Sequence, residues 1–333
     1  MIKAKLKWLA ILASIVMIML LPLIVKDEYT LTILDLVGIY VILASSLNLL
    51  VGYTGQISFA HVAFYAIGGY TSTLLVTKLG WSFWLAMPMA GLVAALVSIP
   101  VGFIVLRFRK HVFVLVTLSL SEIIRLLIYN FDSITGGPNG IFNIPRPDNL
   151  RIFGLVWDFS TPNGIYWLLA TATIITIFCM RAIVRSSMGL ALKSIRENET
   201  YASFSGINVS AYKNAVFIIG ALFAGLAGSL YAHLIGYISP YAFTVAESIN
   251  ILLMIVFGGM GTILGPVIGA SLLVSLPEFL RSVSDYRMII YGALLVIVIL
   301  FMPQGILGMV QSLWRRRPYN SEITANSKLN GKG

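Results

Sequence analysis

The chain has 333 residues, of which 58% are hydrophobic and 11% are charged, and its formal net charge is +10. So low a charged fraction excludes an ordinary soluble protein and indicates a polytopic integral membrane protein. The basic residues lie in short runs at the ends of apolar stretches, where they act as orientation signals, so we expect no nucleic-acid partner. The single cysteine, Cys179, excludes an intrachain disulfide and a thiolate metal site. No metal site is expected.

Apolar windows of about 20 residues predict membrane-spanning helices. The first window follows three lysines, but it is longer than a signal-peptide core and lacks a small-residue cleavage site, so we expect a membrane anchor. In chain order the windows cover residues 8–25, 31–51, 57–77, 83–106, 112–129, 165–180 and 215–235, with further apolar stretches at 247–276 and 288–301.

Two glycine-interrupted segments, at 52–70 and 258–269, are expected to break helices at membrane depth. Broken helices at matching places in two halves of a transporter indicate the substrate path, because freed backbone groups need partners or water. Two alternatives to a substrate path stay open. The glycines of these segments would serve close helix packing, and His61 would make a structural hydrogen bond. The candidate substrate-path residues are Gln56, Ser58, His61, Gly258, Gly259 and Gly261.

Three acidic or basic residues fall inside predicted spans. Glu122 and Arg125 lie three residues apart and share a helix face. An ion pair that neutralises both charges is the favoured interpretation, and gating of a pathway is the alternative. Asp35, near the outer end of its window, is expected to reach the membrane interface.

The loop at 131–164 is rich in turn-forming residues, and its four prolines make it stiff. Its length is unusual for a plain connector, so we expect either a lid over a pore or a landing surface for an external partner. The residues proposed for this role are Gly136, Gly137, Asn139 and Gly140.

A polar, basic segment at 181–213 lies between two predicted spans. It predicts two short helices, 189–196 and 199–205, with Asn198 as the N-cap and Gly206 as the C-cap of the second. Helices this short do not persist alone in water, so they are expected to dock on the bundle and to contact another protein. The sequence contains no G-x-x-x-x-G-K-[ST] phosphate loop, which excludes ATP binding by that route.

The apolar stretch at 247–276 is too long for one span, and its glycines predict a break. Basic loops are expected on the cytoplasmic side of a membrane. If the amino terminus is cytoplasmic, all four basic runs are on that side only if the stretch at 247–276 crosses the membrane twice or enters and leaves on one side. These runs lie near 3–7, 107–110, 181–213 and 315–332. The sequence therefore predicts an all-α polytopic membrane protein of about ten segments, including broken or re-entrant helices, with both termini cytoplasmic. We expect one membrane domain at 1–313 and a basic, disordered cytoplasmic tail at 314–333.

Five ordered blocks carry a resemblance to a known family. They are G-Y-T-G-Q-I-S-F-A-H-V-A-F-Y-A-I-G-G-Y-T at 52–71, T-G-G-P-N-G-I-F-N-I-P-R-P at 135–147, R-S-S-M-G-L-A-L-K-S-I-R-E-N-E at 185–199, F-G-G-M-G-T-I-L-G-P-V-I-G-A at 257–270 and F-M-P-Q-G-I-L-G at 301–308. Together they closely resemble the LivM-type permease subunits of branched-chain amino acid ABC importers, over nearly the whole chain.

The resemblance implies a heteromeric importer in a prokaryotic cytoplasmic membrane, surrounded by lipid. This subunit and a sister permease would form the pore, two ATP-binding cassette ATPase subunits would bind beneath, and an extracytoplasmic solute-binding protein would deliver substrate. ATP and Mg would be bound by the ATPase subunits, with no cofactor and no catalytic residue in this chain. The segment at 181–213 would be the ATPase-coupling loop, with Arg196, Glu197, Glu199, Ala202 and Gly206 as its coupling residues.

Leucine-, isoleucine- or valine-type amino acids suit a mostly apolar path with a few polar groups. Permeases similar to this one also carry urea, short amides or other amino acids, which is the main alternative. An ion-coupled secondary transporter is a weaker alternative, because only Glu122 lies deep in a predicted span and Arg125 is beside it. A hydrolase built on Ser271 and His233 has no oxyanion site to support it.

Overall fold

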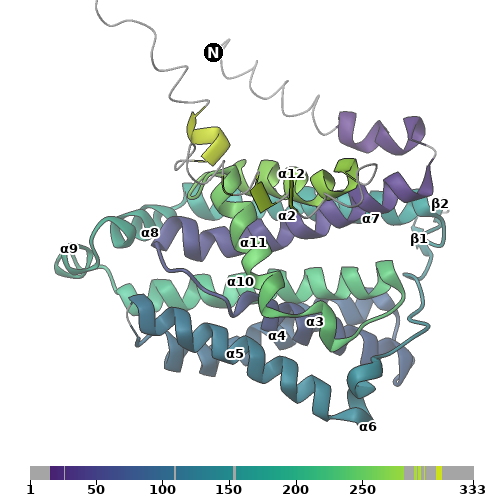
Figure 1. The fold of residues 1–333 in the computed structure, drawn as a ribbon, viewed down its shortest axis with the longest axis horizontal. Coiled ribbons are helices and arrows are strands. Elements are labelled where there is room, and N and C mark those ends of the chain that lie inside the picture. Colours follow the sequence, from purple (N-terminus) through teal and green to yellow (C-terminus); the bar gives the residue numbers. More distant parts are fainter. Residues whose placement is uncertain are drawn as a thin grey trace, which may run out of the picture.

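The computed structural model describes residues 16–25, 27–108, 110–152, 155–280 and 305–309, with five further residues between 289 and 296. Most long helices run lengthwise through the bundle, while α11 crosses them (Figure 1). The long helices are α2 (Glu28–Thr54), α3 (His61–Thr77), α4 (Phe83–Val105), α5 (Lys110–Asn130), α7 (Pro162–Arg185), α10 (Val209–Ile235), α11 (Val245–Gly258) and α12 (Gly265–Phe279).

Shorter elements connect the long helices, and one of them is a β-hairpin. The prediction of an all-α membrane protein is confirmed apart from this hairpin, whose antiparallel strands pair Leu150 with Trp157. It was not predicted because three-residue strands are too short for an alternating pattern. The short elements are α6 (Asp132–Thr135), η1 (Gly137–Asn139), β1 (Leu150–Ile152), β2 (Leu155–Trp157), α8 (Ser187–Glu197), α9 (Glu199–Phe204) and η2 (Pro240–Ala242).

Short polar side chains fix where several helices begin. Asp27 accepts hydrogen bonds from the Thr30 hydroxyl at 2.6 Å and the Thr30 backbone amide at 3.0 Å, which starts α2. These two bonds hold the pKa of the Asp27 carboxyl below its usual value. At the start of α7, Thr161 accepts from the Gly164 amide at 3.2 Å, and Pro162 takes the first helical position.

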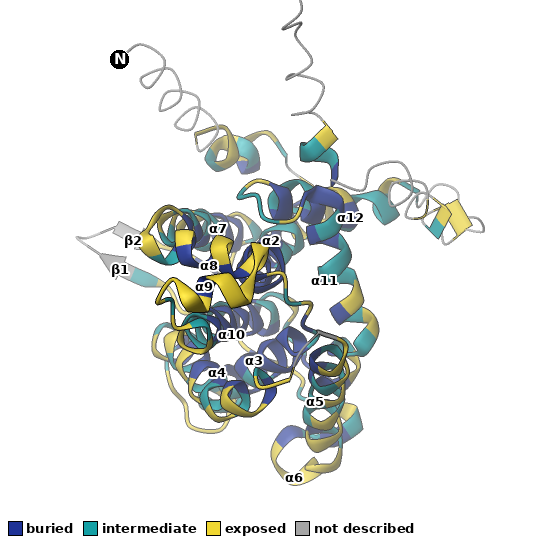
Figure 2. Ribbon diagram, turned by 90° about the vertical axis from the view of Figure 1, so that its left-hand side faces the viewer, coloured by how far each residue is buried: buried dark blue, intermediate teal, exposed yellow. Residues whose placement is uncertain are grey.

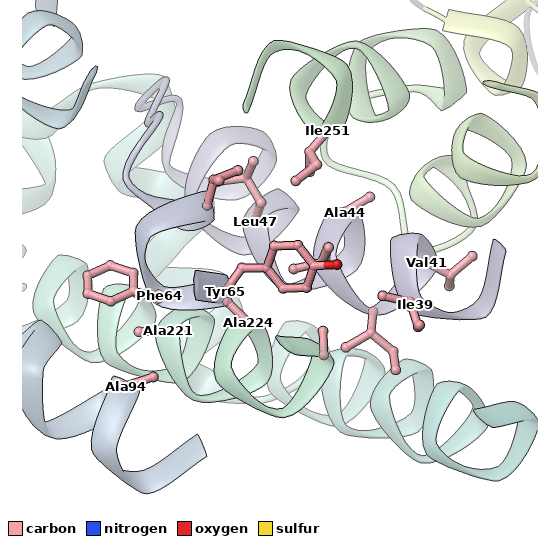
Figure 3. Packing of buried hydrophobic residues seen from close by; sticks show 14 of the residues in the cluster. Ile39, Val41, Ala44, Leu47, Phe64, Tyr65, Ala94, Ala221, Ala224 and Ile251 are labelled. Carbon is pink, nitrogen blue, oxygen red and sulfur yellow. The ribbon is translucent and has the colours of Figure 1, made fainter. Parts of the chain in front are cut away.

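α10 lies at the centre of the bundle and packs against both α3 and α4. Small residues permit this close approach, because a Cβ at Gly68 of α3 would overlap the Gly225 backbone of α10. On its other side Gly225 faces Ala94 of α4. Close packing of this kind stabilises helix pairs in lipid, where the hydrophobic effect does not drive helices together. Figure 3 shows Tyr65 of α3 packed beside Ala224 of α10 in this core.

Six helical segments in the described residues are long and apolar enough to cross a membrane: α2, α4, α5 from His111, α7, α10 and the run Pro240–Gly258 that contains α11. α3 has 17 residues and α12 has 15. Residues 8–15 of the segment predicted at 8–25, most of the segment predicted at 288–301 and the whole tail at 314–333 lie outside the described residues. The chain is therefore a multi-pass helical membrane protein, and the count of ten segments stays a prediction.

The two polar loops of the chain lie at opposite ends of the bundle. α8 and α9 project from one end, while the β-hairpin and α6 lie at the other (Figure 1). The stretch at 247–276 breaks at its glycines, as predicted. α11 and α12 are separate helices that pack together.

Candidate functional site

α8 is docked on the bundle, as the sequence predicted. It packs on α2 and α7 and buries Leu192 and Ile195. A Cβ at Gly189 would overlap the Val184 backbone, so α7 and α8 meet at a tight corner. α8 therefore has little room to move independently of the two spans beneath it.

α9 has the two caps that the sequence predicted. Asn198 Oδ1 accepts from the Thr200 and Tyr201 amides at 3.0 and 3.2 Å. Gly206 follows the last turn with a φ of +84°, and the Ile207 amide donates back to the Ala202 carbonyl at 3.1 Å. These bonds fix both ends of a helix of only six residues.

α9 is also tied to α10 and presents an aromatic surface. Lys213 Nζ on α10 donates to Glu199 Oε1 at 2.5 Å, and Ala202 is buried. Tyr201 and Phe204 are 72% and 84% exposed. Figure 2 views this end of the bundle and shows α9 largely exposed. A rigidly held helix with outward aromatic side chains is a suitable surface for a protein partner.

Arg196, predicted as a residue of the ATPase-coupling loop, is exposed overall, and its guanidinium contacts the bundle. Its Nη1 donates to the Gly52 carbonyl of α2 at 2.6 Å, and its Cγ lies beside Gly55. Gly52 belongs to the last turn of α2, whose carbonyls lack intrahelical partners and carry partial negative charge. A guanidinium is therefore well suited to this position. Glu197, the last residue of α8, is exposed.

The same place joins α2 to the turn between α11 and α12. Asn48 Nδ2 donates to the Thr262 carbonyl at 2.8 Å, and the Gly261 amide donates to Asn48 Oδ1 at 3.0 Å. A Cβ at Gly261 would overlap both the Arg196 guanidinium and the Gly52 carbonyl. We call these five residues, Asn48, Gly52, Arg196, Gly261 and Thr262, the junction. It brings both predicted helix breaks into contact with α8.

The first helix break follows α2 and carries three predicted substrate-path residues. Gly55 caps α2 with a φ of +75°, and the chain has no regular secondary structure until α3 begins at His61. His61 is buried and lies 2.8 Å from Ser46 Oγ through its Nε2, which is the hydrogen bond of the structural interpretation; its contact with substrate stays a prediction. Ser58 is buried and its Oγ accepts from the Ala60 amide at 3.3 Å. The Gln56 side-chain oxygen is buried without a hydrogen-bond partner among the described residues.

The second break shows the close packing that its glycines permit, and their place on a substrate path stays a prediction. A Cβ at Gly258 would overlap the Gly265 backbone, so this glycine allows α11 and α12 to pack. Gly259 and Gly261 adopt φ values of +120° and +73°, which only glycine adopts without strain. Gly305, from the closing F-M-P-Q-G-I-L-G block, lies against Gly259. The break is thus a close-packed turn, with Gly261 in the junction.

The predicted ion pair forms within one helix. Arg125 donates to both carboxylate oxygens of Glu122, with two Nε contacts of 3.0 Å and a closer one from Nη2. The pair does not link two helices. Asp35 is only 3% exposed and is packed in the bundle, and its expected position at the membrane interface stays a prediction. Asp35 and Glu247 each have one buried carboxylate oxygen without a hydrogen-bond partner among the described residues.

The loop at 131–164 is fastened to the segment that follows α10. Ile141 and Ile238 exchange backbone hydrogen bonds of 2.9 and 3.1 Å, and Tyr237 donates to the Asn139 carbonyl at 2.9 Å. The predicted residues Gly136, Gly137 and Gly140 have φ values of +74°, +53° and +71° in the tight turns around η1. So many anchors favour a fixed surface over a hinged lid.

A shallow cavity of about 440 Å³ opens beside the β-hairpin. None of the predicted substrate-path residues lines it; its walls include Trp157, Phe159 and Trp167. Among the described residues, no group of three or more His, Cys, Asp or Glu side chains is placed to hold a metal ion.

His233 holds the same loop through a chain of hydrogen bonds. Its Nδ1 lies 2.7 Å from the Pro145 carbonyl, which can only accept, so Nδ1 carries the proton. Its Nε2 then accepts from Ser72 Oγ at 3.0 Å, and Ser229 donates to Ser72 at 2.7 Å. Both ring nitrogens are occupied, which excludes the pairing of His233 with Ser271 as a hydrolytic base.

Replacing His233 with alanine is expected to lower thermal stability. The change removes the acceptor of the Ser72 hydroxyl proton and the side-chain donor to the Pro145 carbonyl, at a cost of about 1–3 kcal/mol, which corresponds to about 5 °C in the unfolding midpoint. The measurement is a thermal unfolding curve of the purified protein in detergent. His111→Ala, at an exposed histidine, is the matched control. Equal midpoints for the two variants would contradict the assigned role of His233.

The sequence interpretation missed Asn48 and the hydrogen bond from Arg196 to the Gly52 carbonyl. Asn48 was detectable in principle, because a lone amide inside the apolar run Leu47-Asn48-Leu49 cannot be satisfied by lipid. Its partners at 261 and 262 are more than 200 positions away, so no local pattern could identify them.

Known proteins resemble this chain over most of its length. The family described as "Branched-chain amino acid transport system / permease component" matches residues 29–299. The high-affinity branched-chain amino acid transport system permease protein LivM of Escherichia coli (strain K12) is 37% identical over 303 residues, covering 85% of this chain and 71% of that protein. LivM of Salmonella typhimurium is 37% identical over 294 residues, covering 82% and 68%.

The permease protein LivH of the same Escherichia coli strain is 30% identical over 301 residues, covering 81% of this chain and 91% of LivH. No solved structure gives a significant match. The six membrane-length helices and these relatives agree on a multi-pass protein of the inner membrane. Since the family match spans most of the chain, this protein belongs to the branched-chain amino acid transport system permease family.

Proposed function

We propose that this chain is the permease subunit of an ATP-binding cassette importer for branched-chain amino acids. The relatives named as permease proteins of high-affinity branched-chain amino acid transport systems support this substrate class. A sister permease completes the pore, two separate ATPase subunits bind and hydrolyse ATP with Mg, and an extracytoplasmic solute-binding protein delivers the amino acid.

One observation carries the coupling mechanism: the junction connects α8 directly to both helix breaks. Arg196 holds the end of α2, and Asn48 holds the α11–α12 turn. The outward aromatic side chains of α9 form the ATPase contact, and Lys213 keeps α9 fixed to α10. When the ATPase subunits close, a rigid α8–α9 unit moves as a body and displaces the two breaks together. A flexible loop would absorb that displacement.

The proposed orientation places α8 and α9 in the cytoplasm, because their segment, 181–213, is rich in basic residues and such loops stay on the cytoplasmic side of a membrane. The loop at 131–164 then faces outward, and its fixed surface around Gly136, Gly137, Asn139 and Gly140 receives the binding protein. We retain ten segments, both termini in the cytoplasm, a membrane domain at 1–313 and a basic cytoplasmic tail at 314–333.

A specific observation favours a second candidate, uptake driven by an ion gradient. The buried, incompletely paired carboxylates of Asp35 and Glu247 resemble groups that take up protons in ion-coupled transporters. Burial of these two carboxylates also fits a purely structural role. Ion-coupled uptake assigns no role to α8 and α9, which favours the ATPase-driven mechanism.

The decisive experiment is to co-express the chain with its sister permease and an ATPase pair, purify the complex, and reconstitute it in liposomes. We expect leucine-loaded binding protein to stimulate vanadate-sensitive ATP hydrolysis and leucine uptake that a protonophore leaves unchanged. Uptake abolished by the protonophore would favour the ion-coupled candidate. Stimulation by urea-loaded but not leucine-loaded binding protein would redirect the substrate assignment, and failure to recruit any ATPase would refute the proposal.

A further inference from the structure

α5 is the most exposed of the long helices and carries polar groups on its outward side. Only 22% of its apolar window is buried, against 67% for α2. Figure 2 shows α5 at the edge of the bundle, below α11. Its outward residues recur every three or four positions and so share one face: Leu115, Ser119, Glu122, Ile123 and Leu126.

The outward faces of two other spans carry no carboxylate at membrane depth. On α4 the exposed side chains are apolar, among them Leu92, Leu96 and Phe103, and on α7 Ile175 and Phe178 are exposed together with one hydroxyl residue, Thr171. Such faces are fully compatible with lipid tails. The comparison singles out α5, because it alone among these three helices combines an outward hydroxyl with an outward carboxylate.

The described residues cover the ion pair on this face only in part, and Glu122 is its more exposed member. The Glu122 and Arg125 side chains remain 35% and 18% exposed although they are paired with each other. Charged groups at membrane depth face protein or water rather than hydrocarbon, because lipid tails offer no hydrogen bonds. Near the end of α5, Tyr129 contacts the exposed Tyr241 with ring centroids 6.3 Å apart and continues the same polar face.

We propose that this outward face of α5 is the seam with the second permease chain, and that Ser119 and Glu122 border the aqueous passage between the two. The proposal rests on the proposed function, which requires two permease chains. This chain is similar to both LivM and LivH, the two permease proteins of one transport system, so a partner with the same helices is expected. Two such chains related by a pseudo-two-fold axis would place their α5 faces opposite each other.

The first test measures water access in the purified two-permease complex with its ATPase subunits. Cys179→Ala removes the single native cysteine, and Ser119→Cys, Leu96→Cys and Ile175→Cys are then made one at a time. We expect a charged methanethiosulfonate to modify Ser119→Cys at least ~10-fold faster than either control, since thiolates form in water and not in lipid. Equal, slow modification at all three positions would place α5 against lipid and overturn the seam.

The second test identifies the neighbour directly. A benzophenone maleimide attached to Leu126→Cys on α5 is expected to cross-link the second permease on illumination, whereas the same probe on Leu92→Cys of α4 is expected to yield no permease cross-link. Cross-linking from α4 but not α5 would move the interface and refute the proposal. If no second permease co-purifies at all, the proposed function fails as well; an intact complex with a lipid-facing α5 refutes the seam alone.

Discussion

Changing Gly261 to valine is expected to abolish leucine uptake, the largest effect we predict for a single substitution. Gly261 has a φ of +73°, a conformation that costs a β-branched residue about 1–3 kcal/mol. The new side chain would also overlap the Arg196 guanidinium and the Gly52 carbonyl, so the junction must open. We expect uptake in liposomes to fall by a factor on the order of 100, as a loss of about 3 kcal/mol of coupling implies.

Gly80→Val is the matched control for this substitution. Gly80 has a similar φ of +65°, but no heavy atom lies within 4 Å of a Cβ built there. It therefore tests backbone strain without the overlap, and we expect near-normal uptake once the complex is assembled. Size-exclusion profiles must show equal assembly for both variants. Comparable uptake by the two would mean that the contacts of Gly261 are irrelevant to transport.

Arg196→Ala is expected to uncouple ATP hydrolysis from uptake. The substitution removes the charge-assisted hydrogen bond to Gly52 that connects α8 to α2, while the exposed aromatic surface of α9 is unchanged. A bond of this type contributes about 2 kcal/mol, so the amount of leucine imported per ATP should fall about 30-fold. Hydrolysis stimulated by the binding protein should persist, because the ATPase contact is intact.

Lys193→Ala, at an exposed residue of the same helix, removes the same charge without touching the junction. Leucine counted per phosphate released in the same liposomes separates the two variants. If Arg196→Ala instead prevents the ATPase subunits from binding, then Arg196 acts at the ATPase surface and the junction has been misassigned. A normal ratio of leucine to phosphate would equally argue against the mechanism.

Much of this architecture could be predicted because the signals are local. Apolar windows gave five of the long spans to within a few residues, and Asn198 and Gly206 marked the ends of α9 because caps depend on neighbouring residues. The break between α11 and α12 followed from glycine and from charge parity.

The remainder depends on contacts between distant residues. Whether a glycine marks a path or a packing surface depends on what faces it: Gly68 meets Gly225, and Gly258 meets Gly265. The structural role of His61 depends on Ser46 in another helix. The burial of Asp35 could not be predicted either, because it depends on the packing of α7 against α2. Single-sequence patterns carry no information on such pairs.

α10 connects the two ends of the bundle. Its 27 residues correspond to about 40 Å of continuous helix. Near one end Lys213 holds α9, and near the other His233 holds the Pro145 carbonyl of the loop at 131–164. An axial shift or rotation imposed on α9 would therefore reach the loop at 131–164 through one continuous helix, and the reverse would also hold. In the proposed transporter, binding of the loaded solute-binding protein and closure of the ATPase subunits would then act on the same helix, so each event would affect the other.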